Sequence, residues 1–300
     1  MKNSNFIEKI KNRSPKDLKV EEVYLNTDLN DESIKYLKKQ NYLKFSKIEK
    51  ILQNNFISNH PIGYVIKNQN NDIVGFMGTI FSYKEADNEK KTFCNIHTWI
   101  VDDKHRIYSY LLLIPLIEKK VVLTAFTPVK TLVGLLEKFG FKKIKMQYRI
   151  IFLLNLFNFI NKNDFTIEKN SSAIKKILNE HDLKIYENYI NIPCEKFTIL
   201  NKRDNSKYIF VVASKAKKKM FQVLNLFYVS DNNEMKKNWH IIKKKIANEF
   251  DLSFCCQYFF DEYYSSIPNN FFSKSLDKEI CIKNLKNQNK LDTLYSDLIE

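Results

Sequence analysis

The chain has 300 residues, of which 44% are hydrophobic and 28% charged, and its formal net charge at pH 7 is +15. This length exceeds what one small core needs and predicts two domains or lobes. The charge suggests a polyanion partner, but only four of the 49 basic residues are arginine. Nucleic-acid grooves use arginine for bidentate contacts, and a lysine-rich, glycine-poor composition is typical of AT-rich coding. A nucleic-acid partner is therefore not expected.

The cysteines and the apolar runs narrow the class of protein further. The five cysteines form no CxxC pair and have no neighbouring histidine, so we expect them to be reduced and buried and expect no metal site. The strongest apolar run, 150–160, is shorter than the about 20 residues of a membrane helix. The N-terminus lacks a signal-peptide pattern. These features predict a cytoplasmic protein without a membrane partner and leave the oligomeric state open.

The first half of the chain alternates strand and helix patterns. A hairpin set followed by a β-α-β-α-β run predicts a mixed α/β fold, with a mixed sheet flanked by helices. The expected elements are a strand at 18–26, one or two helices capped at Asp31 or Ser33 and extending to about 55, a hairpin of 63–68 and 72–83, an exposed loop at 85–91, a strand at 92–101, a helix at 107–119, a strand at 121–126, a helix begun by Thr127 and Pro128 and ended by Gly140, and a final strand.

The second half shows part of the same order less clearly. A helix is predicted at 174–188, a hairpin at 207–215 and 220–230, a helix from Asn232 or Asn233 to about 250, and a strand after it. We therefore expect a first domain at 1–155 and a second, smaller α/β lobe at 156–300. This lobe is interpreted either as a separate fold or as a degenerate repeat of the first.

A junction between a strand and a helix carries the strongest functional signal. The strand that ends at Val101 continues through a short polar loop into an apolar helix, with Arg106 at its start. A helix N-terminus presents free N–H groups and the positive end of the helix dipole, which suit an anion such as pyrophosphate. An ordinary turn with a solvated arginine gives the same pattern, so the junction alone leaves both interpretations open.

Four motifs in order resemble the GNAT superfamily of acyl-CoA-dependent acyltransferases: the hairpin with IVGFMGTI, the junction VDDKHR, the strand VVLTAFTP and the helix end LLEKFGF. The resemblance covers about residues 18–150. It implies a GNAT-like sheet, acetyl-CoA as co-substrate, and an amine of a small molecule or amino sugar as acceptor. The family's backbone amides at this junction hold the CoA pyrophosphate. The implied cofactor-binding residues are Trp99, Ile100, Val101, Arg106, Ile107, Tyr108, Ser109, Tyr110 and Leu111.

The chain differs from the family pattern at positions that bind the cofactor or take part in catalysis. The junction lacks the family's glycines, which let a backbone approach a ligand closely. The tyrosine that often serves as the acid toward the CoA thiolate is replaced by Leu136, and an asparagine common near the start of the same helix is replaced by Val129. The usual acid is therefore absent.

Other side chains are candidates for the proton transfers. His97 lies on the strand before the junction, and an imidazole with an ordinary pKa near 6.5 suits a base. Tyr108 or Tyr110 could replace the missing acid. Packing is the alternative role of all three, and His97 is expected to share one face of its strand with Trp99. In the second lobe, residues 261–264 could line an acceptor pocket or form an exposed loop.

Three functions stay open on sequence grounds. The first is an acyl-CoA-dependent N-acyltransferase, which His97 and the Arg106 junction favour. The second is a catalytically inactive GNAT-fold protein that binds acyl-CoA or acts as a scaffold, which Leu136 favours. The third is a tRNA-dependent aminoacyl transferase, which only the basic charge favours.

Overall fold

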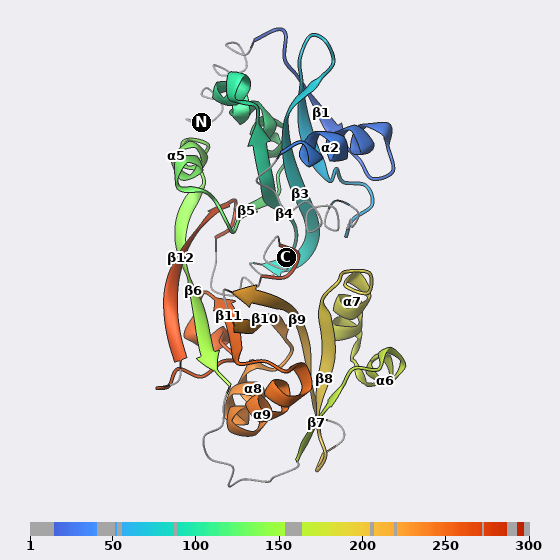
Figure 1. Cartoon of the computed structure of the whole chain (residues 1–300), viewed down its shortest axis with the longest axis vertical. Coiled ribbons are helices and arrows are strands. Elements are labelled where there is room, and N and C mark those ends of the chain that lie inside the picture. The colour runs from blue at the N-terminus through green and yellow to red at the C-terminus, as the bar shows by residue number, and fades with distance from the viewer. Residues whose placement is uncertain are drawn as a thin grey trace. The chain divides into compact units, whose positions relative to one another are not determined.

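The computed structural model describes residues 15–40, 52, 56–86, 89–153, 164–204, 207–218, 221–271, 273–286 and 293–296. The chain divides into two compact units, and Figure 1 labels most of their helices and strands. The first unit comprises residues 1–144, 279–287 and 295–298, and the second comprises residues 145–278, 288–294 and 299–300. No helix in the described ranges is both long and apolar enough to cross a membrane.

The first unit is built on strands paired in the order β1-β2-β3-β4-β5. The pairs are antiparallel as far as β4, whereas β4 and β5 are parallel and are joined by a helical crossover. Its elements are β1 (Lys19–Val23), α2 (Asp28–Lys38), β2 (Gly63–Lys67), β3 (Ile73–Ala86), β4 (Glu89–Val101), the 3-10 helix η1 (Asp103–Leu113), α4 (Ile114–Glu118), β5 (Val122–Ala125) and α5 (Lys130–Lys138).

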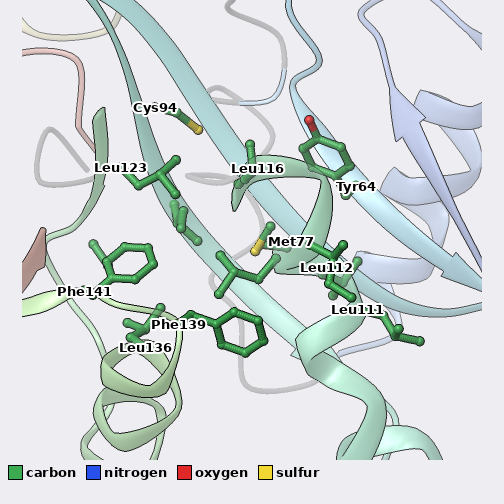
Figure 2. Packing of buried hydrophobic residues seen from close by; sticks show 14 of the residues in the cluster. Tyr64, Met77, Cys94, Leu111, Leu112, Leu116, Leu123, Leu136, Phe139 and Phe141 are labelled. Atoms are coloured by element: carbon green, nitrogen blue, oxygen red, sulfur yellow. The ribbon is translucent and has the colours of Figure 1, made fainter. Parts of the chain in front are cut away.

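Apolar residues of the first unit gather on the two faces of its sheet. The face that carries the crossover packs Tyr64, Met77 and Leu123 against η1, α4 and α5, and we call this cluster the crossover core (Figure 2). The opposite face packs Val65 and Phe76 against α2, and we call this cluster the α2 core. Because side chains alternate along a strand, membership of a core assigns each β4 residue to a face.

The second unit repeats the order of the first. Its strands pair as β7-β8-β9-β10-β11, with antiparallel pairs as far as β10 and a parallel β10-β11 pair. Helices α8 and α9 make the crossover and cover one face. Its elements are β7 (Phe165–Glu168), α6 (Ser171–Ile177), α7 (Glu180–Asn188), β8 (Glu195–Asn201), β9 (Tyr208–Lys218), β10 (Phe221–Val229), α8 (Asn232–Lys237), α9 (Trp239–Phe250), β11 (Phe254–Phe259) and the 3-10 turn η2 (Glu262–Tyr264).

Corresponding positions of the two units carry corresponding contacts. Asn95 of β4 lies in register with Thr124 of β5, whose hydroxyl donates to the Asn95 Oδ1 atom at 3.2 Å. Asn225 of β10 lies in register with Cys256 of β11, whose thiol donates to the Asn225 Oδ1 atom. Both β4 and β10 therefore hold an asparagine bonded to the neighbouring parallel strand.

Two strands cross the boundary between the units. β6 (Lys142–Phe152) follows α5 in the chain but pairs antiparallel with β11. β12 (Ser273–Lys283) follows β11 in the chain but pairs antiparallel with β5 through residues 281–283. The paired strands of each unit are therefore extended by a strand that follows the strands of the other unit in the sequence.

The mixed α/β fold expected from sequence is confirmed, and several element boundaries are corrected. Thr27, and not Asp31 or Ser33, caps α2, because its hydroxyl accepts from the Asn30 N–H at 3.3 Å. β3 and β4 extend to Ala86 and from Glu89, where an exposed loop was expected. The helix expected to begin at Thr127 and Pro128 begins at Lys130, and Gly140 ends it with a φ of 82°. The helical prediction at 41–51 lies outside the described residues.

The expected helix at 174–188 is two helices, α6 and α7, because Leu178 has an extended backbone between them. The helix expected from Asn232 is likewise divided into α8 and α9 at Asn238. Pairing with neighbouring strands extends β9 to Lys218, where a turn was expected.

Candidate functional site

The junction after β4 is a 3-10 helix and not the α-helix expected from sequence. η1 continues for 11 residues before the short α4 begins at Ile114. Asp102 stands at its start, but the Asp102 side chain makes no cap hydrogen bond. Instead, the Tyr36 hydroxyl of α2 donates to the Asp102 Oδ1 atom at 2.9 Å. The carboxylate is thus held by α2 and does not accept from the first amides of η1.

At the corresponding junction of the second unit, an aspartate side chain caps the helix. Asp231 precedes α8, and the Asp231 Oδ1 atom accepts from the Glu234 N–H at 2.8 Å. A carboxylate bonded to these amides occupies the position that an anion would take and repels one. Of the two crossover junctions, only the first therefore leaves its starting amides without a side-chain cap.

Arg106 projects from η1 into solvent, with 72% of its side chain exposed. Its guanidinium forms an ion pair with Asp103, three residues earlier, which is also exposed. Exposed ion pairs contribute at most about 1 kcal/mol, whereas a guanidinium binds phosphate in a bidentate, charge-assisted geometry. The Asp103 pair is therefore a weak competitor for Arg106, and a pyrophosphate contact of Arg106 stays a prediction.

The other implied cofactor-binding residues are divided between core and surface. The side chain of Ile100 belongs to the α2 core, and those of Val101 and Leu111 belong to the crossover core. Trp99, Tyr108 and Tyr110 are partly buried against the crossover core, Ser109 is half-buried, and Ile107 is 73% exposed. Buried side chains cannot contact a ligand on the surface, so Arg106 and Ile107 are the side chains of this segment most open to one.

β4 contains a bulge that the sequence did not indicate. The register with β3 shifts between the Gly78–His97 and Phe76–Ile100 pairs, and Thr98 has a φ of 46°. Such a value is uncommon for a residue other than glycine. Because one extra residue reverses the alternation, His97 and Trp99 lie on opposite faces. The expectation that these two residues share a face was therefore wrong.

His97 lies on the α2 side of the sheet and is 5% exposed. Its imidazole covers the backbone of Gly78 on β3. The Nδ1 atom is 2.9 Å from the Thr98 hydroxyl, and within the described ranges the Nε2 atom has no hydrogen-bond partner. Burial lowers the pKa of His97 to about 4. The imidazole is therefore neutral at pH 7. In the tautomer whose Nδ1–H donates to the Thr98 hydroxyl, the Nε2 lone pair is available.

β4 loses one of its two neighbours just before His97. It pairs with β5 only from Phe93 to Asn95, whereas its pairing with β3 continues to Val101. From Ile96 onward, β4 therefore has no β5 partner among the described residues. The backbone groups along this edge are available to an extended ligand, because an unpaired strand edge presents a row of N–H and C=O groups.

The predicted acids do not meet the predicted base. Tyr108 and Tyr110 pack against the crossover core, on the face opposite the His97 imidazole. Leu136 is fully buried in the same core. His97 lies in the part of β4 that has no β5 partner among the described residues, with its imidazole over Gly78 on β3, and neither tyrosine lies with it. The catalytic roles of Tyr108 and Tyr110 therefore stay predictions.

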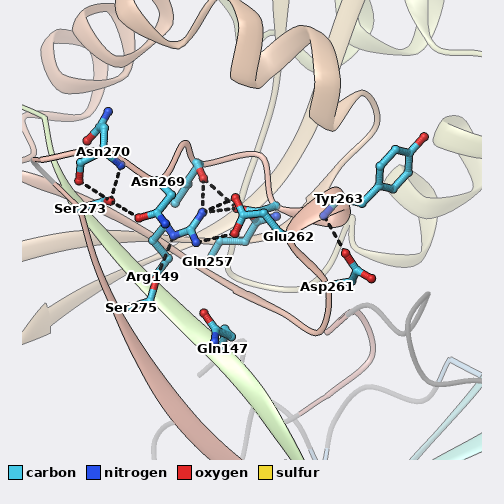
Figure 3. A network of polar contacts seen from close by, with 12 residues as sticks. Gln147, Arg149, Gln257, Asp261, Glu262, Tyr263, Asn269, Asn270, Ser273 and Ser275 are labelled. Carbon is cyan, nitrogen blue, oxygen red and sulfur yellow. Dashed lines mark hydrogen bonds and ion pairs between the residues drawn. The ribbon is translucent and has the colours of Figure 1, made fainter.

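Residues 261–264 contain the 3-10 turn η2, which the Arg149 side chain holds through Glu262 (Figure 3). Arg149, 1% exposed, donates from Nη1 and Nη2 to the two carboxylate oxygens of Glu262 at 2.8 and 2.5 Å. It also donates to the Ser275 hydroxyl and the Ile267 carbonyl, both at 2.9 Å. The hydrogen bonds from Arg149 lower the pKa of Glu262. This arginine, which the sequence did not single out, anchors the turn.

The described residues contain no group of three or more histidine, cysteine, aspartate or glutamate side chains that could hold a metal ion. His60 stacks on Phe81 with ring centroids 4.3 Å apart, and burial lowers its pKa. Cys94, Cys255, Cys256 and Cys281 are buried and form no disulfide, as expected, whereas Cys194 is half-buried and the expectation of burial was wrong for it.

No protein-family model matches the chain, and no curated protein matches it in sequence. Several solved structures are similar to it in three dimensions. A GCN5-related N-acetyltransferase from Anabaena variabilis is similar over 90% of this chain and 73% of its own, with a TM-score of 0.58 and 10% identity. The glucosamine N-acetyltransferase region of a fungal multi-domain GH3 β-N-acetylglucosaminidase is similar over 90% of this chain and 38% of its own, with a TM-score of 0.58 and 12% identity. Saccharomyces cerevisiae N-myristoyltransferase with bound myristoyl-CoA is similar over 92% and 81%, with a TM-score of 0.51 and 8% identity.

The chain has the GCN5-related N-acetyltransferase fold. The resemblance inferred from four short motifs is confirmed at the level of the fold. The matches extend over about nine tenths of the chain and therefore over both units, whereas the motifs covered only the first half.

Proposed function

We propose that the first unit binds acyl-CoA and transfers its acyl group to an amine. The observation that carries this proposal is the uncapped start of η1, where Tyr36 holds the Asp102 carboxylate away from the first amides. The amides and Arg106 would hold the pyrophosphate, because a helix start and a guanidinium both favour anions. The free edge of β4 would hold the extended arm of the cofactor.

Acyl-CoA would supply an activated thioester, and His97 is the group that we propose accepts a proton. Its neutral Nε2 atom has no partner in the described structure, and Thr98 fixes the orientation of the ring. A proton taken from an acceptor ammonium frees the amine to attack. The lowered pKa makes His97 a weak base in water, so the proposal requires transfer inside a site from which water is excluded.

The alternative is a GNAT-fold protein that binds acyl-CoA without turnover. Two observations favour it: Leu136 is buried where the family's acid is frequent, and burial keeps the pKa of His97 near 4. Both functions need the cofactor site, so cofactor binding does not separate them.

Release of free thiol from acetyl-CoA in the presence of a panel of amines separates the two. If the chain is an acyltransferase, we expect thiol release that depends on the amine, at a rate that decreases at least tenfold in His97→Gln. Cofactor binding without amine-dependent thiol release would support the binding protein and contradict the enzyme.

A further inference from the structure

His97 is enclosed by the chain, although the proposed function requires an amine to reach it. The side chain is 5% exposed, and within the described ranges its Nε2 atom is buried without a hydrogen-bond partner. An acceptor amine cannot contact this atom unless part of the chain that covers it moves. The arrangement in the structure is therefore closed, and a chain that transfers an acyl group at His97 must also adopt an open one.

α2 covers one end of the sheet face on which His97 lies. Phe76 and Ile100 belong, together with Tyr36 of the helix, to the α2 core. The Tyr36 hydroxyl also holds the Asp102 carboxylate at 2.9 Å. Movement of α2 would break this core and would release the carboxylate toward the first amides of η1. α2 therefore cannot open the face without disturbing the proposed cofactor site.

Tyr295, which belongs to the first unit, lies at the other end of the same face. Ser82 and Phe93 are register partners there, and Phe93 precedes His97 by four residues on β4. Lys84 follows Ser82 by two residues on β3, and its Nζ atom is 5.6 Å from the centroid of the Phe93 ring. The same Nζ atom is 5.7 Å from the centroid of the Tyr295 ring. Because register partners and residues two apart share a face, Tyr295 lies on the side of the sheet that carries His97.

The backbone of Tyr295 is strained. Its φ is 56°, in the left-handed region that a bulky residue rarely adopts. The residue is 8% exposed, and its ring packs edge-on against Phe56 with the two centroids 4.7 Å apart. Burial of the ring thus offsets the strain of the backbone. Strain of this kind is typical of segments that change between two arrangements.

The closed arrangement also leaves buried polar atoms unsatisfied on this face. Among the described residues, the Ser82 Oγ atom is buried without a partner, as is the His97 Nε2 atom. Such atoms have lost their hydrogen bonds to water, which destabilises the arrangement that buries them. Opening the face returns both atoms to water or offers them to an acceptor. The closed arrangement is therefore opposed both by these atoms and by the backbone of Tyr295.

We infer that Tyr295 is a movable cover, whose displacement opens the Ser82 end of this face and admits the acceptor amine to His97. The inference rests on the proposed function, which gives His97 its role. Phe93 lies about 13 Å along β4 from His97, so the acceptor enters along the strands from the Ser82 end. The cofactor is proposed to bind at η1, beyond the opposite end of β4. The two substrates therefore enter from different ends of this strand.

Modification of histidines by diethyl pyrocarbonate, followed for each residue by peptide mass spectrometry, tests the inference on the full chain without cofactor. The reagent acylates the neutral imidazoles that it can reach, so the rate at His97 reports how often the face is open. We expect His97 to react slowly in the parent and at least fivefold faster in Tyr295→Ala. His181, exposed in the second unit, is the internal standard and should react at the same rate in every chain.

Tyr83→Ala is the matched control. Tyr83 precedes Lys84 on β3, so its side chain lies on the opposite face, where it is 49% exposed and has the Lys90 Nζ atom 4.6 Å from its ring centroid. This variant also removes a tyrosine ring that contacts a lysine, and it should leave the His97 rate unchanged. An equal His97 rate in Tyr295→Ala and the parent, or a similar increase in Tyr83→Ala, would overturn the inference. So would an increase that accompanies loss of the cooperative thermal unfolding transition.

Thiol release from acetyl-CoA relates the cover to turnover. The apparent affinity for a ligand is reduced by the fraction of chains that are open to it. Tyr295→Ala should therefore lower the KM for the amine at least threefold and leave the calorimetric affinity for acetyl-CoA unchanged. Faster modification of His97 with an unchanged amine KM would contradict the admission of the acceptor. Faster modification without thiol release from any chain would support the movable cover and contradict the proposed function alone.

Discussion

The imidazole of His97 lies on the backbone of Gly78, its partner on β3: a Cβ added at Gly78 would be 2.4 Å from the His97 Cε1 atom and 2.5 Å from Nε2. Gly78→Ala must therefore displace the ring or the strand. We expect a loss of about 2 kcal/mol of unfolding free energy, within the range for overpacked cores. Urea unfolding measures it.

Gly134→Ala is the control for this substitution. An added Cβ at Gly134, in α5, meets nothing within 4 Å. Alanine is favoured over glycine in a helix interior by about 0.5–1 kcal/mol, so this variant should be more stable than the parent. Equal stability of Gly78→Ala and the parent would show that the ring does not occupy this position.

The pH dependence of stability is expected to report the burial of His97. Its pKa is about 4 in the folded chain, against 6.5 for an unperturbed histidine. Between these values the unfolded chain binds more protons, so the contribution is complete above pH 6.5 and decreases as the pH is lowered to about 4. The loss is at most about 3 kcal/mol. Denaturant unfolding at several pH values should show a shallower slope in His97→Gln, and identical slopes would contradict the assignment.

The Arg149–Glu262 clamp is expected to be costly to break. Arg149→Lys keeps the charge but cannot make the bidentate pair, and it leaves the Ser275 and Ile267 oxygens with fewer donors. We expect a loss of about 2 kcal/mol in urea unfolding, because each buried oxygen left without a donor costs about 1–3 kcal/mol. Arg203→Lys, at an exposed pair with Asp164, should change stability by less than about 0.5 kcal/mol. Similar losses in both variants would contradict a special role for Arg149.

β6 follows the strands of the first unit but pairs with β11, and β12 follows the strands of the second unit but pairs with β5. We therefore predict that neither half of the chain folds alone. A chain ended at residue 155 lacks residues 281–283, which pair with β5. Its β5 edge would be unpaired, and we expect no cooperative unfolding transition by circular dichroism. Adding residues 273–286 back through a flexible linker should restore a transition. A cooperative transition of 1–155 alone would show that β12 is dispensable.

The sequence predicted the features that depend on local pattern and not those that depend on distant partners. Apolar alternation located β2, β3 and β4, and Gly140 located the end of α5. The resemblance located the junction at Arg106, whose exposure the structure supports. These features are encoded by residues a few positions apart in the chain.

The remainder depends on contacts between residues far apart in sequence. The bulge at Thr98 contains no glycine, so the sequence gives no local signal of it, and the pairing of β3 with β4 determines its position. Tyr36 reaches Asp102 across 66 residues, and that contact leaves the start of η1 uncapped. The role of Arg149 depends on Glu262, 113 residues later. Contacts between residues so far apart cannot be predicted from hydrophobic periodicity or from a short motif.

The central claim is that the uncapped start of η1 and Arg106 form an anion site for acyl-CoA. Calorimetric titration of the full chain with acetyl-CoA tests it most directly, with Arg106→Glu as the variant and Arg203→Glu, at an exposed arginine of the second unit, as the control. We predict micromolar binding by the parent chain and by Arg203→Glu, and affinity at least tenfold weaker in Arg106→Glu. No binding by the parent, or equal binding by Arg106→Glu, would contradict the account.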